Sequence, residues 1–160
     1  MNKLDLTYRR LGLTEADLRS VSVTFQKIVT GVIGEALHYF EYSKFLDEAR
    51  MAIFDSAGYK GEFEDNDEGW NLPVIGYTLK VRSPVRAGEL VEVTGWCHRI
   101  EGVRGWMGFT VKNLSTGKDA ACGYSEHCFT DSKTMKPIAP NPEWRIFRSL
   151  RLRASQGGVS

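Results

Sequence analysis

Apolar and polar residues alternate in several stretches of the chain, with the two-residue period of half-buried β-strands. In the first of these stretches the alternating apolar side chains are Val21, Val23 and Phe25. Further strands are predicted at 74–82, 90–100, 106–112 and 120–130, with short turns that contain glycine between them. Because short turns join neighbouring strands in opposite directions, we expect the last three strands to form an antiparallel meander.

A helical period replaces the two-residue period at 38–57. This segment contains neither proline nor glycine, and its apolar residues are spaced as on one face of a helix. These residues are Tyr42, Phe45, Leu46, Ala49 and Ile53. Gly58 follows at the place of a C-terminal cap, so one long helix is predicted here. A brief helix is predicted after Thr14, which resembles an N-cap with the acidic Asp17 in the first turn.

The predicted order is one strand, one long helix and four further strands. A sheet with one apolar face needs a cover, and the long helix is the predicted element large enough to provide it. We therefore predict an α+β fold in which an antiparallel sheet wraps around a single central helix. Residues 1–20 form an N-terminal extension with a short helix, 21–140 the main domain, and 141–160 a basic C-terminal tail.

The composition is typical of a soluble domain: 160 residues, of which 42% are hydrophobic and 26% charged, with a formal net charge of +1. No apolar run approaches the roughly 20 residues that cross a bilayer, and the first residues do not resemble a secretory signal. We therefore expect a cytoplasmic protein without a membrane partner. The near balance of 21 basic and 20 acidic residues argues against nucleic acid as a partner.

The three cysteines favour reduced thiols, since the count is odd and the chain is too large to need disulfides. Cys97-His98 and His127-Cys128 place soft ligands side by side, but neighbouring residues of a strand point to opposite faces. The acidic run at 62–69 lacks the alternating ligands of a Ca²⁺ loop and is interpreted as a solvated loop. We expect no metal site and no redox cofactor.

Three stretches of the chain carry the pattern of a known family. In the first, a tyrosine is followed five positions later by an acidic residue and three beyond it by an arginine: Tyr42, Asp47 and Arg50. Residues 77–89 end a strand in Pro-x-x-x-Gly-Glu, and residues 129–137 begin with Phe-Thr-Asp and end in Lys-Pro. Together these stretches resemble the hotdog-fold acyl-CoA thioesterases of the 4-hydroxybenzoyl-CoA thioesterase kind, over roughly 21–140.

This resemblance implies a hotdog fold and the hydrolysis of an acyl thioester, with coenzyme A or an acyl carrier protein as the thiol carrier and no cofactor. A sheet of this size with an exposed edge usually pairs with a second copy, so we expect a homodimer or homotetramer with the pocket between subunits. The chain departs from many family members in the loop before the helix, because residues 30–37 lack their Asp-x-x-Gly. The enediyne-type branch also lacks this Asp, and its arginine matches Arg50.

The start of the long helix could supply donors for the oxyanion that forms when a thioester is attacked. Its first amides have no intrahelical partners, so those near 38–40 are the predicted oxyanion hole. Glu35, just before the helix, is the first choice for nucleophile or general base, with a capping role equally open. His38 is the second choice, as a base or a group that polarises the carbonyl, against the alternative of a packed histidine.

Asp47 and Arg50 lie three residues apart on one helical face, which also fits an intrahelical ion pair. By the resemblance, Asp47 reaches the pocket of the partner subunit as base or nucleophile, and Arg50 orients Asp47 or the substrate carbonyl. Tyr39, Phe40 and Tyr42 are the predicted substrate-binding residues, with plain core packing as the alternative for these rings.

Two other functions and one further binding region stay open. The segment Gly-Val-x-x-Glu-Ala-Leu at 31–37, which leads into the long helix, faintly resembles the corresponding segment of hotdog dehydratases that act on hydroxyacyl thioesters. The histidine of those enzymes, however, lies upstream of this segment. A hotdog domain that only binds acyl thioesters or dimerises is the other alternative. Residues 133–153 carry six basic residues against Glu143, a cluster that suits the phosphates of coenzyme A or an acidic carrier protein, unless it is a flexible tail.

Overall fold

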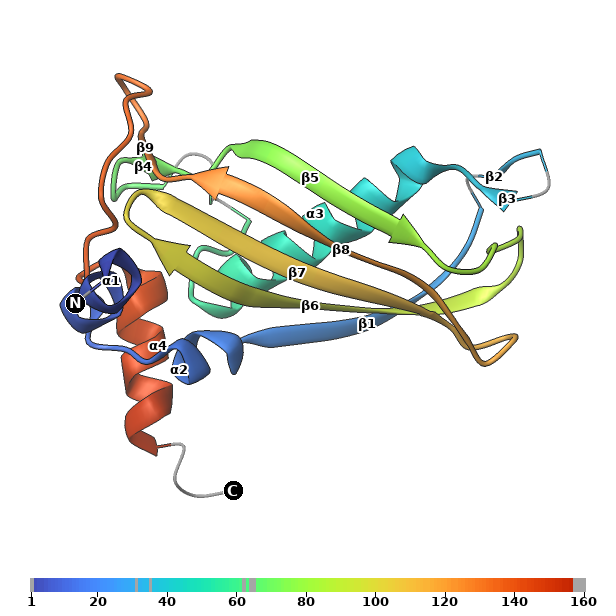
Figure 1. The fold of residues 1–160 in the computed structure, drawn as a ribbon, viewed down its shortest axis with the longest axis horizontal. Coiled ribbons are helices and arrows are strands. Elements are labelled where there is room, and N and C mark those ends of the chain that lie inside the picture. The colour runs from blue at the N-terminus through green and yellow to red at the C-terminus, as the bar shows by residue number, and fades with distance from the viewer. Residues whose placement is uncertain (1, 31, 35, 62, 64–65, 157–160) are drawn as a thin grey trace.

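A five-stranded antiparallel sheet with one long helix across it forms the body of the protein (Figure 1). The computed structural model describes residues 2–30, 32–34, 36–61, 63 and 66–156. The strands of this sheet lie in the order β1 (Ser22–Ile28), β6 (Leu90–Glu101), β7 (Arg104–Asn113), β8 (Lys118–Cys128) and β5 (Val74–Val81). Two short pairs complete the strands: β2 (Val32–Ile33) with β3 (Ala36–Leu37), and β4 (Trp70–Asn71) with β9 (Thr130–Asp131).

The strand predictions are confirmed, with ends that differ by a few residues. Strands β6, β7 and β8 form the predicted meander, because each pairs antiparallel with the next along the chain. Strand β5 instead pairs with β8, and β1 pairs with β6. As a result β5 and β1 are the two edges of the sheet.

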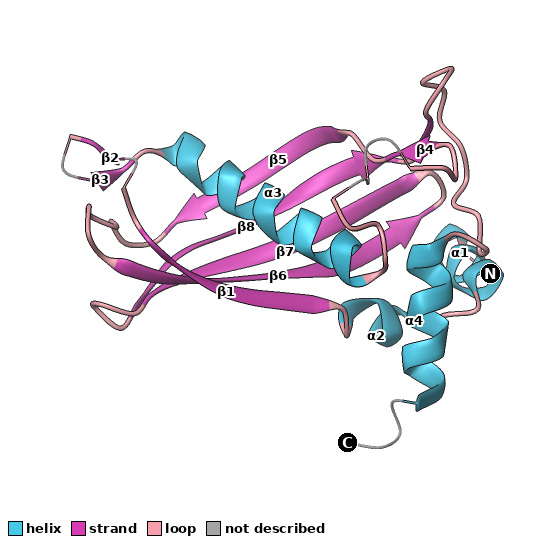
Figure 2. Cartoon of the chain, turned by 180° about the vertical axis from the view of Figure 1, so that it is seen from behind, coloured by secondary structure: helices cyan, strands magenta, loops and turns pink. Residues whose placement is uncertain are grey.

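The long helix α3 (Tyr39–Ser56) crosses the inner face of the sheet, as Figure 2 shows from behind. His38 is its N-cap, and Gly58 follows the C-cap Ala57 with a φ of 99°. The helix lies close to the sheet at Gly95, where an added Cβ would be 2.6 Å from the Cβ of Ala49. Glycine at position 95 therefore allows the helix and the sheet to come into contact. The predicted α+β fold, a sheet wrapped around one helix, is confirmed.

Three further helices cover one end of the sheet: α1 (Lys3–Leu11), α2 (Glu15–Arg19) and α4 (Arg145–Gln156) (Figure 1). The cap predicted before α2 is confirmed, because the Asp17 N–H donates to Thr14 Oγ1 and the Thr14 N–H to the Asp17 carboxylate. None of the helices in the described ranges is both long enough and apolar enough to span a bilayer.

The C-terminal segment differs from the expected basic tail, because its described part, up to Gln156, contains the ordered helix α4. The helix buries Ile146, Phe147 and Leu150 against the core. These three side chains fall on one helical stripe, and Arg148 between them is exposed, so the segment is both basic and amphipathic. The basic residues dominate the composition of this segment, so its charge alone does not reveal the apolar stripe.

Candidate functional site

An open cleft of about 420 Å³ lies beside the middle of α3, between that helix, the segment leading into β5 and the turn after β9. Among the residues that the structure describes, its lining includes Leu72, Pro73, Val74 and Met135 and the charged side chain of Arg50. The helical period that predicted α3 also places Arg50 on the flank that faces β4 and β5. The side chain of Arg50, one of the predicted catalytic residues, therefore lines the cleft.

Arg50 is held from two sides. Its Nη1 donates a hydrogen bond of 3.0 Å to the carbonyl oxygen of Leu72, and its Nη2 lies 3.4 Å from Oδ1 of Asp47. The Arg50 side chain is only 13% exposed, whereas that of Asp47 is 59% exposed. The predicted ion pair is thus present, with a fixed guanidinium and a carboxylate that reaches solvent. A guanidinium has five N–H donors, so these two contacts leave others for a ligand.

A buried polar pair lies next to Arg50, on β8. His127 Nδ1 is 3.2 Å from the same Leu72 carbonyl, and His127 Nε2 is 2.6 Å from Oγ of Ser125. Since a carbonyl oxygen can only accept, Nδ1 carries the proton and Nε2 accepts from the serine hydroxyl. Burial, and then the charge of Arg50, lower the pKa of His127 to about 4, so its imidazole is neutral at pH 7.

Sequence reasoning considered His127 only as a metal ligand beside Cys128 and missed this network. The signal was available, since the two-residue period of β8 puts Ser125 and His127 on the same, helix-facing side. The hydrogen-bond partner of His127 Nδ1, however, is the backbone carbonyl of the loop residue Leu72, and a pattern of side chains does not predict such a contact. Within the described ranges, no cluster of three or more His, Cys, Asp or Glu is placed to hold a metal ion.

Tyr77 of β5 is another residue that sequence reasoning left without a role. Its ring stacks on Phe109 with centroids 6.2 Å apart, on the helix-facing side of the sheet. Burial, and then the negative charge of Asp47, raise the pKa of Tyr77 to about 12. Its phenol therefore remains protonated at neutral pH and is a hydrogen-bond donor in the neighbourhood of Asp47.

The predicted substrate-binding aromatic residues divide into two kinds. Tyr42 is 1% exposed and lies in the core, where burial raises the pKa of its hydroxyl. Tyr39 and Phe40 are 56% and 60% exposed at the start of α3, and their rings cluster with that of His38. The exposed pair is available to a ligand or to a second chain.

At the start of α3, backbone N–H groups near the predicted oxyanion hole donate hydrogen bonds within the same chain. The N–H of Phe40 donates to Nδ1 of His38 at 3.4 Å, and the N–H of Glu41 donates to the His38 carbonyl. His38 therefore uses one ring nitrogen as a cap. Glu35, the first choice for the catalytic carboxylate, lies outside the described residues. His38 precedes Asp47 by nine residues, about 13 Å along a helix axis, so the two halves of the predicted site do not meet within one chain.

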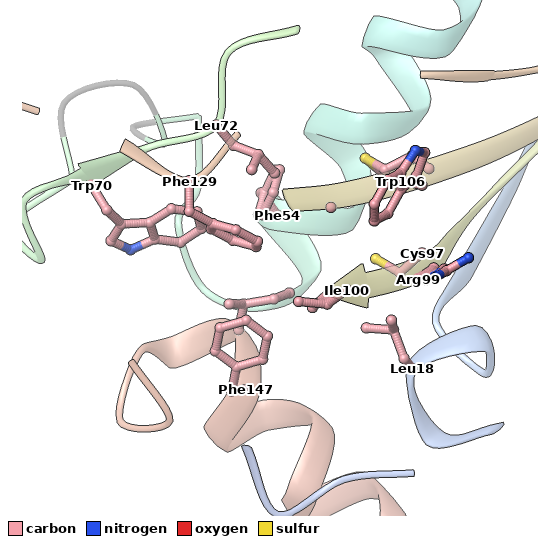
Figure 3. A pocket seen from close by; sticks show the side chains of 13 residues that line it. Leu18, Phe54, Trp70, Leu72, Cys97, Arg99, Ile100, Trp106, Phe129 and Phe147 are labelled. Atoms are coloured by element: carbon pink, nitrogen blue, oxygen red, sulfur yellow. The ribbon is translucent and has the colours of Figure 1, made fainter. Parts of the chain in front are cut away.

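A small apolar cavity of about 40 Å³ lies behind the cleft, at the end of α3 (Figure 3). Phe54, Phe129 and Phe147 gather around it, and Leu72 borders both this cavity and the cleft. Cys97 also lines it, and burial raises the pKa of its thiol to about 12, so the thiol is not a nucleophile at neutral pH.

The interpretation of the acidic run as a solvated loop is wrong for Glu68. Its Oε1 accepts hydrogen bonds from the Tyr59 hydroxyl (2.6 Å) and from Nε1 of Trp70 (3.2 Å). Its Oε2 accepts from the backbone N–H of Arg145 at 2.8 Å, which is the first residue of α4. This carboxylate fastens the C-terminal helix to the core and has no place in the candidate site.

Comparison with known proteins identifies the fold of this chain through solved structures alone. No family model matches the chain. A search of the curated proteins finds no match either.

Solved structures, in contrast, match over most of the chain. A DHNA-CoA thioesterase from Staphylococcus aureus is 17% identical, with 87% of this chain and 95% of that chain covered and a TM-score of 0.67. A 1,4-dihydroxy-2-naphthoyl-CoA thioesterase from Synechocystis is 14% identical, with 81% and 98% covered and a TM-score of 0.67. A hypothetical protein from Staphylococcus aureus, solved in complex with CoA, is 14% identical, with 84% of each chain covered and a TM-score of 0.69.

The chain therefore has the hotdog fold, as the sequence resemblance implies, and its solved structural neighbours include thioesterases. At these identities the likeness shows the fold. The chemistry depends on this chain's own residues.

Proposed function

We propose that this protein hydrolyses an acyl thioester, carried by coenzyme A or by an acyl carrier protein, to a free acid and a thiol. The observation that carries the proposal is the placement of Arg50, fixed at the wall of a cleft with the exposed carboxylate of Asp47 beside it. The occurrence of thioesterases and of a CoA complex among the neighbours of this fold supports the choice of substrate.

In this proposal Asp47 takes a proton from water, and the resulting hydroxide attacks the thioester carbonyl. The carbon–oxygen π electrons move to the oxygen, where free N–H donors of Arg50 stabilise the negative charge. The carbon–sulfur bond then breaks, and the proton held by Asp47 passes to the thiolate. The neutral Tyr77 hydroxyl is a further donor near Asp47.

A second copy of the chain completes the proposed site. His38, at the start of α3, stands about 13 Å from Asp47 along the helix axis of one chain, too far for both to act on one carbonyl. Strand β5 is an unpaired edge that carries exposed apolar side chains, among them Ile75 at 51% and Val81 at 49%. Pairing of two chains at this edge would bury these side chains and bring the helix start of one chain toward the middle of α3 in the other.

Within such a dimer, Glu35 and Asp47 remain the two candidates for the carboxylate that activates water. Phe40 and Tyr39 of one chain would then contact the acyl group held at Arg50 of the other. A homotetramer built from two such dimers fits the same proposal.

Thiol release from short, long and aromatic acyl-CoAs tests the proposal directly, with the wild type compared with Asp47→Asn, Glu35→Gln and Arg50→Lys. We expect Arg50→Lys to lower kcat about 100-fold, since the loss of an oxyanion donor has effects of this order. The carboxylate variant that abolishes turnover identifies the base. Glu48→Gln is the matched control, because Glu48 lies on the same helix and pairs with Lys27 on the surface.

Absence of turnover with every acyl-CoA and with acyl carrier protein thioesters would contradict hydrolysis. Retained binding of acyl-CoA in that case would favour the non-catalytic alternative. Formation of an enoyl thioester from a hydroxyacyl thioester without thiol release would favour the dehydratase.

A further inference from the structure

The polar network behind Arg50 consists of residues that no part of the proposed chemistry uses. His127 and Ser125 are both 0% exposed. Their side chains stand in line, with the Ser125 hydroxyl on His127 Nε2 and His127 Nδ1 on the Leu72 carbonyl. A buried histidine with both ring nitrogens engaged is fixed in tautomer and in orientation.

The Leu72 carbonyl is where this network meets the cleft. It accepts from His127 Nδ1 at 3.2 Å and from Arg50 Nη1 at 3.0 Å, so the two donors share one oxygen. Leu72 lies in the two-residue segment between β4 and β5, where the carbonyl of the next residue, Pro73, accepts from the N–H of Cys128 on β8 at 3.3 Å. Among the described residues, the donors to the Leu72 carbonyl are Arg50 from the cleft and His127 from the core, so His127 holds this oxygen from the core side.

We propose that His127 is a positioning residue for Arg50: its hydrogen bond to the Leu72 carbonyl holds that oxygen where it fixes the guanidinium in the cleft. This inference rests on the proposed function, in which Arg50 meets the thioester carbonyl. Neutrality of the imidazole supports it, because an imidazolium beside Arg50 would repel the guanidinium. The low pKa of His127 follows from burial and from that neighbour.

A serine next to a histidine also resembles the nucleophile and base of hydrolases, and the structure argues against that role. A nucleophile must reach the carbonyl carbon, whereas Ser125 is wholly covered and does not line the cleft. The hydroxyl of Ser125 acts here as the donor that fixes the tautomer of His127.

Two substitutions of His127 separate positioning from mere packing. The amide nitrogen of His127→Asn lies near the place of Nδ1 and can still donate to Leu72. The amide of His127→Gln extends to the place of Nε2 and keeps the contact with Ser125 instead. Asparagine is the smaller side chain and leaves the larger cavity, so His127→Asn should lower the melting temperature more than His127→Gln.

We expect activity to follow the opposite order. His127→Gln should lower kcat about tenfold with little change in KM, while His127→Asn should stay within about threefold of the wild type. Activity that follows the melting temperature, or equal losses in both variants, would overturn the inference. Ser125→Ala should keep most of the activity, and its complete loss would make Ser125 part of the chemistry instead.

A measurement without substrate keeps this inference separate from the proposed function. The Nε–H signal of Arg50 in NMR reports how firmly the guanidinium is held, because this nitrogen is buried. Its exchange with solvent should be slow in the wild type and in His127→Asn, and faster in His127→Gln. Unchanged exchange in His127→Gln contradicts positioning, whereas a wild type that releases no thiol contradicts the proposed function alone.

Discussion

Trp144 stacks on Trp70, with ring centroids 4.4 Å apart and planes at 7°. Trp70 belongs to β4, and Trp144 immediately precedes α4, so residues 74 positions apart in the chain form one contact. Trp70 is 0% exposed and Trp144 6%. The C-terminal helix is therefore part of the core at the end of the sheet that also holds the small apolar cavity.

We expect Trp144→Ala to lower the free energy of unfolding by about 3–5 kcal/mol, the range for removal of a buried indole. The measurement is equilibrium unfolding in urea. Leu152→Ala is the control on the same helix, since Leu152 is 60% exposed and its truncation should change stability by less than about 0.5 kcal/mol. Equal effects of the two substitutions would show that α4 does not pack as described.

Glu68→Gln should destabilise the protein by about 1–3 kcal/mol, because three donors converge on this partly buried carboxylate and an amide can accept from fewer of them. Asp67→Asn is the matched control. Asp67 also meets Arg145, at 2.7 Å, but its side chain is 87% exposed, and surface pairs of this kind contribute about 0–1 kcal/mol. A larger loss in Asp67→Asn than in Glu68→Gln, measured by urea unfolding, would contradict the role given to Glu68.

The fold was predictable because most of its helices and strands have a recognisable local pattern of apolar and polar residues. The two-residue period marked all five strands of the main sheet, and the helical spacing around Tyr42 and Ile53 marked α3. The start of α2 was predictable for the same reason, since Thr14 and Asp17 act within four residues of each other. Helix α4 was missed because its arginines dominate the composition, although Ile146, Phe147 and Leu150 follow a helical stripe.

The candidate site was predictable only in part, because a site depends on contacts between distant segments. The pair of Asp47 and Arg50 is local and could be identified from its spacing. The carbonyl of Leu72 and the ring of His127 are 55 positions apart, and no spacing rule connects them. Glu68 shows the same limit. Its acidic neighbours in the sequence predict a solvent-exposed side chain, whereas its carboxylate accepts hydrogen bonds from Tyr59 and Arg145.

The stability of the protein should depend on pH through His127. Its pKa is lowered from 6.5 to about 4, so between these values the unfolded chain binds a proton here that the folded chain does not. The free energy of unfolding should therefore fall as the pH drops from 6.5 to 4, by about 3 kcal/mol in all, and this contribution should level off below pH 4.

The comparison of wild type with His127→Gln isolates this contribution in urea unfolding at pH 7, 5.5 and 4.5. The variant should lose less stability than the wild type across this range. His98→Gln is the comparison for a less buried histidine, whose pKa is also lowered, chiefly by burial, and its curve should stay closer to that of the wild type than the curve of His127→Gln does. Parallel curves for wild type and His127→Gln would mean that His127 is not the buried neutral group described above.

The edge of the sheet at β5 provides the test of the shared site. Ile75→Lys places a charge on an exposed apolar side chain of this edge, and a charged edge resists pairing with another strand. We expect the wild type to sediment as a dimer or larger, and Ile75→Lys to shift toward the monomer at equal concentration with a matching loss of thiol release. Ile28→Lys is the control on the opposite edge, since Ile28 ends β1 and is 64% exposed. Dissociation by Ile28→Lys but not by Ile75→Lys would place the contact at β1, and a monomeric wild type with full activity would show that one chain suffices for the chemistry.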